Sequence, residues 1–207
     1  MLLEVDGIVE ANASSGLGAI YSDRPLMRSL LNDVDVDSPN WEQGFRRNWG
    51  ARMASGFGRM SDESAMKLLR PMATTLGSFN REQCDRYVNA KKQTPPKNPF
   101  SDMMLPAMSA SDVLQLLDGF HDALMADLSA LPLRPLPNAT ELTNLNTQIN
   151  QLLPAQKAGV EPPTSCEALT AVVRAIEHME QPNRSLSITY LMTIAGFYAQ
   201  KLSSAPR

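Results

Sequence analysis

The chain has 207 residues, of which 43% are hydrophobic and 20% are charged, a balance typical of a folded domain and not of a disordered segment. The formal net charge of −3 argues against a generic nucleic-acid binder. The start, residues 1–6, lacks the basic and apolar regions of a signal peptide, and the longest uncharged stretch, residues 185–200, is too short and too polar to span a bilayer.

The composition favours helices over strands. Aromatic residues make up 6% of the chain and methionine occurs 12 times, and Leu, Ala and Met lose little rotamer freedom in a helix. The sequence shows no pair of alternating apolar segments joined by a hairpin turn. We therefore expect an all-α fold, an irregular bundle of roughly seven to nine helices with proline-rich connections.

The first clear helix is expected to begin after Asp23, a residue suited to the N-cap. Pro25 then lies in the first turn, where its missing N–H costs nothing. An acidic run at 33–37 ends this helix. The preceding residues 1–22 fit either a short helix or a loop, because apolar residues are followed by a run of Ser and Gly.

A second helix is predicted from Ser38-Pro39, and along it an apolar residue recurs at every fourth position. This spacing forms a slanted ridge of the kind that packs into grooves of neighbouring helices. The ridge consists of Trp41, Phe45, Trp49, Met53 and Phe57. Two interpretations are open, a core helix with solvated arginines or a contact surface, because Trp and Arg are frequent at interface hot spots. The candidate contact residues are Trp41, Phe45, Arg46, Arg47, Trp49 and Arg52.

Two more helices are predicted before residue 90. Ser61 suits the N-cap of the first, which Pro71 would kink or divide because proline removes a backbone hydrogen bond. Asn80 and Gln83 have the spacing of a capping box and open the second.

A proline-rich run at 93–99, preceded by Lys91 and Lys92, is the best linker in the chain. The length of the chain fits one domain. We therefore expect either a single all-helical domain over residues 1–207, or two packed helical subdomains, 1–92 and 100–207, joined by this linker.

Helices are also predicted after the linker. The first begins at Ser111-Asp112 and is strongly periodic, and Pro132, Pro135 and Pro137 mark a stiff extended crossing behind it. Two further helices open with capping boxes. These boxes are Asn138 with Glu141 and Thr164 with Glu167. The final helix, 184–203, is apolar nearly all round, so we expect it at the centre of the core.

Charge is distributed unevenly along the chain. Residues 42–97 carry eleven Lys and Arg against five Asp and Glu, whereas the flanks 1–41 and 98–207 carry net charges of −5 and −4. Either the basic segment complements the acidic flanks within the fold, or it binds an anionic ligand or nucleic acid. We favour the first interpretation.

The two cysteines, Cys84 and Cys166, are either joined in a disulfide or present as two buried thiols. A bridge would close a long loop and stabilise the fold by about 4 kcal/mol in the chain-entropy model. A cytoplasmic location is the default expectation. A bridge, or an N-terminal signal already removed, would instead indicate a periplasmic or secreted protein.

Candidate catalytic chemistry is sparse. The two histidines, His121 and His178, lie beside acids in the segments 118–122 and 177–180, which could form an acid/His site with or without a metal. The repeated Glu-x-x-His pattern of helical di-iron sites is missing. The sequence also lacks a Gly-x-Ser-x-Gly elbow and a complete phosphate-binding glycine loop.

These observations favour a non-catalytic helical protein, such as an adaptor, accessory factor or inhibitor, that binds another protein. No cofactor and no metal are expected, and a nucleic acid is not the expected partner. The first alternative is a helical enzyme with an acid/His site from 118–122 and 177–180. The second is binding of an anionic ligand or nucleic acid through 42–97.

Overall fold

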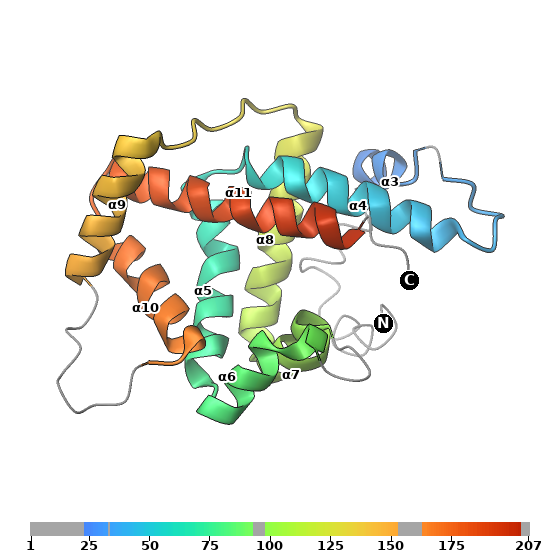
Figure 1. The fold of residues 1–207 in the computed structure, drawn as a ribbon. Helices are drawn as coiled ribbons and strands as arrows, with labels where there is room; N and C mark the ends of the chain where they lie inside the picture. Colours follow the sequence, from blue (N-terminus) through green and yellow to red (C-terminus); the bar gives the residue numbers. More distant parts are fainter. Residues whose placement is uncertain (1–22, 33, 93–97, 153–162, 204–207) are drawn as a thin grey trace. The chain divides into compact units, whose positions relative to one another are not determined.

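The computed structural model describes residues 23–32, 34–92, 98–152 and 163–203, with side chains except at 91 and 197–203. Of the described residues 77% are helical and none lies in a strand (Figure 1). The prediction of an all-α, multi-helix fold is therefore confirmed. The α-helices are α3 (Arg24–Leu30), α4 (Trp41–Phe57), α5 (Asp62–Ser78), α6 (Arg81–Val88), α7 (Leu105–Ala107), α8 (Ala110–Leu128), α9 (Ala139–Leu152), α10 (Ser165–His178) and α11 (Asn183–Ser203).

Local capping explains where several helices begin. The carboxylate of Asp23 accepts the N–H of Leu26 at 2.9 Å and caps α3 as predicted. The starts of α6, α9 and α10 carry capping boxes, in which the N-cap side chain and the side chain three residues later each accept the other's backbone N–H. The boxes are the predicted ones, Asn80 with Gln83, Asn138 with Glu141 and Thr164 with Glu167.

Two helix starts differ from the prediction. α4 begins at Trp41, because the hydroxyl of Ser38 accepts the N–H two residues later and holds a turn ahead of the helix. α8 begins at residue 110, because Ser109 and not Ser111 accepts an N–H from the first turn.

The region around Pro71 and the region after residue 98 also bear on the prediction. α5 is one helix through Pro71, so of the two expected outcomes, a kink or a division, the division is wrong. A π-helix at Phe100–Met104 leads into α7, although no helix is predicted there. Asn98 explains its start, because its side chain accepts the N–H of Phe100 at 3.1 Å while Asp102 accepts the N–H of Asn98 at 2.8 Å. The predicted linker 93–99 lies largely outside the described residues, as does the ambiguous segment 1–22.

The chain divides into two compact units that each take residues from both sides of 93–99. Unit 1 comprises Met1–Leu68, Leu114–Leu136 and Ile188–Arg207, and unit 2 comprises Leu69–Val113 and Pro137–Ser187. The helices α5, α8 and α11 each contribute one part to either unit. These boundaries do not coincide with the expected subdomains 1–92 and 100–207.

In unit 1, glycine allows α4 to approach two other helices closely. A Cβ atom on Gly56 would lie 1.9 Å from the carbonyl oxygen of Ala123 on α8. A Cβ atom on Gly196 of α11 would lie 2.9 Å from the carbonyl oxygen of Ala54. Figure 1 shows α11 running beside α4. No larger residue fits at either position unless the backbones separate.

α11 is buried along one side only, over its described side chains in unit 1. Ile188 and Met192 are 0% and 2% exposed, whereas Tyr190 and Ile194 are 40% and 38% exposed. Residues two positions apart point to opposite sides of a helix, so the two pairs cannot share one environment. The expectation of a centrally buried helix is therefore wrong for this part of α11.

The core of unit 2 contains a disulfide. The sulfur atoms of Cys84 on α6 and Cys166 on α10 lie 2.09 Å apart, and both residues are buried, at 1% and 2% exposure. Leu76, Phe79 and Met104 belong to the same buried cluster. Of the two interpretations open for the cysteines, the structure thus contains the bridged one.

Candidate functional site

Three aromatic side chains form a row along the first half of α4, in unit 1. The residues are four positions apart, which places them on one side of the helix. The ring centroids of Trp41 and Phe45 lie 6.3 Å apart and those of Phe45 and Trp49 lie 6.2 Å apart, within the range of interacting aromatic pairs. We call Trp41, Phe45 and Trp49 the aromatic strip.

The exposure of the predicted ridge changes along α4. Trp41 is 39% exposed and Phe45 and Trp49 are half-buried, whereas Met53 and Phe57 are buried at 3% and 6%. The ridge therefore leaves the core of unit 1 midway along the helix. Core packing accounts for its second half, and the aromatic strip is the half that is only partly buried.

The three candidate arginines lie on different sides of α4. Neighbouring residues are about 100° apart on a helix, so Arg52 shares the side of the strip, Arg46 borders it and Arg47 projects from the far side. Arg46 pairs with Glu42 at 2.8 Å, and both side chains are largely exposed. Arg47 is exposed and makes no hydrogen bond or ion pair with another described residue. Of the exposed arginines, Arg46 is thus the one next to the strip.

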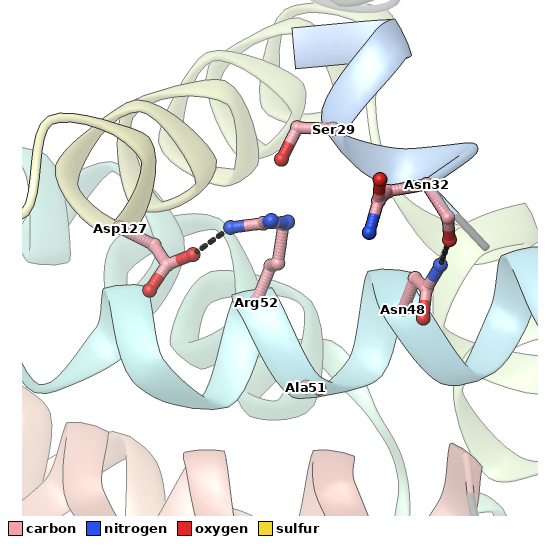
Figure 2. Close-up of a pocket in the computed structure, with 6 residues that line it drawn as sticks. All are labelled: Ser29, Asn32, Asn48, Ala51, Arg52 and Asp127. Carbon is pink, nitrogen blue, oxygen red and sulfur yellow. Dashed lines mark hydrogen bonds and ion pairs between the residues drawn. The ribbon is translucent and has the colours of Figure 1, made fainter.

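A polar pocket of about 310 Å³ lies on the same helix, where α3, α4 and the end of α8 meet in unit 1 (Figure 2). It is lined by Ser29, Asn32, Asn48, Ala51, Arg52 and Asp127. Arg52 belongs both to this pocket and to the predicted contact residues.

Asn48 joins α3 to α4 at one end of the pocket. Its side-chain amide donates to the carbonyl oxygens of Leu30 at 3.0 Å and Asn32 at 2.8 Å. The last carbonyl groups of a helix have no partner within the helix, so this amide acts as a C-terminal cap for α3. It also holds α3 and the following turn against α4.

Arg52 joins α4 to α8 at the other end of the pocket. Its guanidinium lies 2.7 Å from the carboxylate of Asp127, and the two side chains are 32% and 13% exposed (Figure 2). Because the carboxylate is mostly shielded from water, loss of Arg52 would leave it without compensation. The pair thus fixes the position of the helix that carries the strip.

The pocket residues offer hydrogen bonds but no nucleophile with a neighbouring base. Ser29 is the one hydroxyl among the lining residues, and none of them is a histidine or cysteine. The single carboxylate of the lining, on Asp127, is already paired with Arg52. These residues are suited to binding polar groups and not to covalent catalysis.

The acids of the predicted acid/His segments take part in ion pairs. Asp122 lies 2.8 Å from the ammonium group of Lys67 in unit 1, and Glu177 pairs with Arg70 in unit 2. The hydrogen bond to Asp122 raises the pKa of Lys67 above its ordinary value of 10.5. His121 is half-buried on α8 in unit 1, and His178 is exposed at the end of α10 in unit 2. Within the described part of the chain, no group of three or more His, Cys, Asp or Glu could hold a metal ion.

Among the described residues, three ion pairs connect the basic segment 42–97 to acids that follow it in the chain. The pairs are Arg52 with Asp127, Lys67 with Asp122, and Arg70 with Glu177. Each joins two different helices. Such pairs are what intramolecular complementarity between the basic segment and the acidic C-terminal flank predicts.

Two residues of this region have structural roles that were not predicted from the sequence. Asn48 is one, although an Asn inside a helix is unfavourable and indicates a hydrogen-bonding role. Asp127 is another, and no local pattern indicates that its partner is Arg52, 75 positions earlier.

Among the described residues, no helix combines the length and the apolar character needed to cross a bilayer. No protein-family model, curated protein sequence or solved structure matches this chain. A proposal of function therefore rests on the side chains described above.

Proposed function

We propose that the protein is a non-catalytic protein-binding protein, such as an adaptor, accessory factor or inhibitor, with the first half of α4 as its contact surface. The aromatic strip is the observation that carries this proposal. Both tryptophans of the chain and one phenylalanine lie in a row on a helix side that is only partly buried. Rigid aromatic side chains contribute large contact areas at low entropic cost and dominate binding hot spots.

The spacing and charge of the strip indicate the kind of partner. Anchors at i, i+4 and i+8 suit a helix that lies in an apolar groove of another protein. Arg46 borders the strip, and its exposed pair with Glu42 contributes only a few tenths of a kcal/mol, so an acid of the partner can replace Glu42 at little cost. We therefore expect an apolar groove with acidic residues at its rim.

The residues of the polar pocket have a positioning role in this proposal. Asn48 attaches α3 to α4, and Arg52 attaches α4 to α8 through Asp127. A helix held in this way presents its aromatic side chains in one arrangement, which reduces the entropy lost on binding.

The test compares partner binding by the full chain and by two double variants. Trp41→Ala with Trp49→Ala removes two strip residues. Val88→Ala with Leu169→Ala, which are 55% and 41% exposed on α6 and α10, is the matched control. A protein captured from the native source is purified and titrated against all three. We expect the strip variant to bind at least about tenfold more weakly, and the control to bind like the wild type.

Equal affinity of the strip variant and the wild type would contradict the proposal and place the contact surface elsewhere. Two other measurements, the salt dependence of nucleic-acid binding and enzymatic turnover, separate the alternatives. Binding to nucleic acid would weaken steeply with salt, since phosphate contacts release counterions. An acid/His enzyme would instead lose turnover on replacement of His121 or His178 by alanine.

A further inference from the structure

Prolines favour an extended backbone in a short segment after α8. Residues 131–136, Leu-Pro-Leu-Arg-Pro-Leu, contain no helix or strand and belong to unit 1. Prolines at 132, 135 and 137 fix their own φ near −65° and keep each preceding residue out of the helical region. Within residues 131–136, Leu133 is the one residue that is neither a proline nor directly followed by one. We call residues 131–136 the Leu-Pro strap.

Hydrogen bonds attach the strap to unit 1. The backbone N–H of Arg134 donates to the carbonyl oxygen of Gly58 at 2.8 Å, and its guanidinium pairs with Asp62. The side chain of Arg134 is only 14% exposed, so this ion pair is largely shielded from water. At the start of the strap, the guanidinium of Arg59 donates to the carbonyl oxygen of Leu131. The strap is therefore anchored at its start and in its middle.

The leucines of the strap are exposed. Leu131, Leu133 and Leu136 are 44%, 66% and 57% exposed. Of the ten exposed large hydrophobic side chains among the described residues, three thus lie within six consecutive positions. Scattered exposed leucines need no explanation, whereas three within one short anchored segment single it out as a candidate interaction site.

We propose that the Leu-Pro strap is a preformed ligand for a protein domain that binds polyproline II segments in a groove lined by Tyr and Trp. Such grooves recognise extended proline-rich chains through apolar contacts and through donors to the backbone carbonyl groups. Its prolines favour this conformation before binding, so the strap loses little entropy when it enters the groove.

The backbone of the strap favours this partner over one that adds a β-strand. Strand addition needs a ladder of backbone N–H donors. Pro132 and Pro135 have no N–H, and the N–H of Arg134 already donates to Gly58. What remains for a partner is the Leu and Pro side chains, together with backbone carbonyl groups that Tyr O–H and Trp N–H can bond.

The charge of the strap separates it from the aromatic strip. Its one cation, Arg134, is paired with Asp62 inside unit 1. We therefore expect a groove that depends on apolar contact and not on acidic side chains. Binding through the strap should accordingly change little with ionic strength.

The test uses the full chain and a panel of purified SH3, WW and EVH1 domains, titrated by fluorescence anisotropy. Leu133→Ser with Leu136→Ser removes the two most exposed leucines of the strap. Leu152→Ser with Leu169→Ser, on α9 and α10 at 47% and 41% exposure, is the matched control. We expect the wild type and the control to bind the same domain, and the strap variant to bind it at least about tenfold more weakly. Raising NaCl from about 50 to about 500 mM should change the affinity less than about twofold.

A second variant tests the anchoring. Arg134→Ala retains every leucine and proline but releases the middle of the strap, so its affinity should fall several-fold while the same domain is still recognised. The proposal is overturned if no domain of the panel binds the wild type. It is equally overturned if the Leu133→Ser, Leu136→Ser variant binds as tightly as the wild type.

Discussion

The two compact units are both helical, yet different interactions hold them together. In unit 1, α4 contacts α8 and α11 through Gly56 and Gly196, at distances that leave no room for a side chain. In unit 2, a covalent bond between Cys84 and Cys166 joins α6 to α10 within a buried cluster. Close backbone packing stabilises the folded state directly, whereas a disulfide acts chiefly by restricting the unfolded chain. Substitutions that add a side chain at these glycines should therefore destabilise unit 1, whereas loss of the disulfide should destabilise unit 2.

The surfaces of the units differ as well. Unit 1 contains the aromatic strip, in which Trp41 is exposed and Phe45 and Trp49 are half-buried, and the Leu-Pro strap with its three exposed leucines. In unit 2 the described large apolar side chains that are exposed, Val88, Leu152 and Leu169, lie far apart in sequence on three different helices. Single exposed residues of this kind are ordinary on protein surfaces. This difference places both proposed contact surfaces in unit 1.

Loss of the disulfide should have the largest effect and act on unit 2. Replacement of Cys84 and Cys166 by alanine opens a loop with a sequence separation of 82 residues. The chain-entropy model predicts a decrease of about 4 kcal/mol in the free energy of unfolding, measurable by urea denaturation. Amide exchange should increase more in α6 and α10 than in α4. A decrease under about 1 kcal/mol would show that the bridge contributes little.

A side chain at Gly56, where α4 and α8 are in close contact, should destabilise unit 1. In Gly56→Ala the new Cβ would lie 1.9 Å from the carbonyl oxygen of Ala123, so α4 and α8 must separate. We expect the free energy of unfolding to fall by about 3 kcal/mol. The control is Gly44→Ala, whose Cβ would meet the two methyl groups of the Val34 side chain at 3.3 and 3.4 Å and should change stability by less than about 1 kcal/mol. Similar losses for both variants would rule out close packing as the cause.

A substitution at the end of α8 in unit 1 should raise the free energy of unfolding, by a smaller amount than the losses above. Ala130 has a φ of 50°, in the left-handed region, where glycine is more favourable than alanine. Ala130→Gly should therefore raise the free energy of unfolding by about 1 kcal/mol. Ala51→Gly, inside α4, should lower it by a similar amount, since glycine disfavours a helix interior. A loss of stability in both variants would contradict the strain assigned to Ala130.

The smallest expected effect concerns the cap of α10 in unit 2. The N–H of Thr164 donates to the carboxylate of Glu167 at 2.6 Å, and this bond lowers the pKa of Glu167 below its ordinary value of 4.5. A lowered pKa stabilises the fold above pH 4.5, and this contribution is lost as the pH falls through the folded-state pKa. Between about pH 5 and pH 3 the melting temperature should therefore fall more in the wild type than in Glu167→Gln. Identical acid profiles of the two proteins would contradict this assignment.

The N-caps of α3, α6, α9 and α10 could be predicted because each depends on residues three positions apart. Asp23, Asn80, Asn138 and Thr164 all accept an N–H from their own first turn. The four-residue spacing likewise predicted the ridge on α4. Two predicted helix starts were wrong. The hydroxyl of Ser38 accepts an N–H within a turn that precedes α4, and Ser109 takes the place of Ser111 as the acceptor at the start of α8.

The helical class, most helix starts and the set of residues on each side of α4 can be read from the sequence, since these follow from interactions within one or two helical turns. Packing between helices accounts for the exposure of Trp41 and the burial of Phe57, for the pairing of Arg52 with Asp127, and for the exposure of the strap leucines. These outcomes depend on residues that are far apart in the chain, 75 positions for Arg52 and Asp127 and 82 for Cys84 and Cys166. Local periodicity predicts that a residue is apolar or charged. Its neighbours depend on how the helices pack.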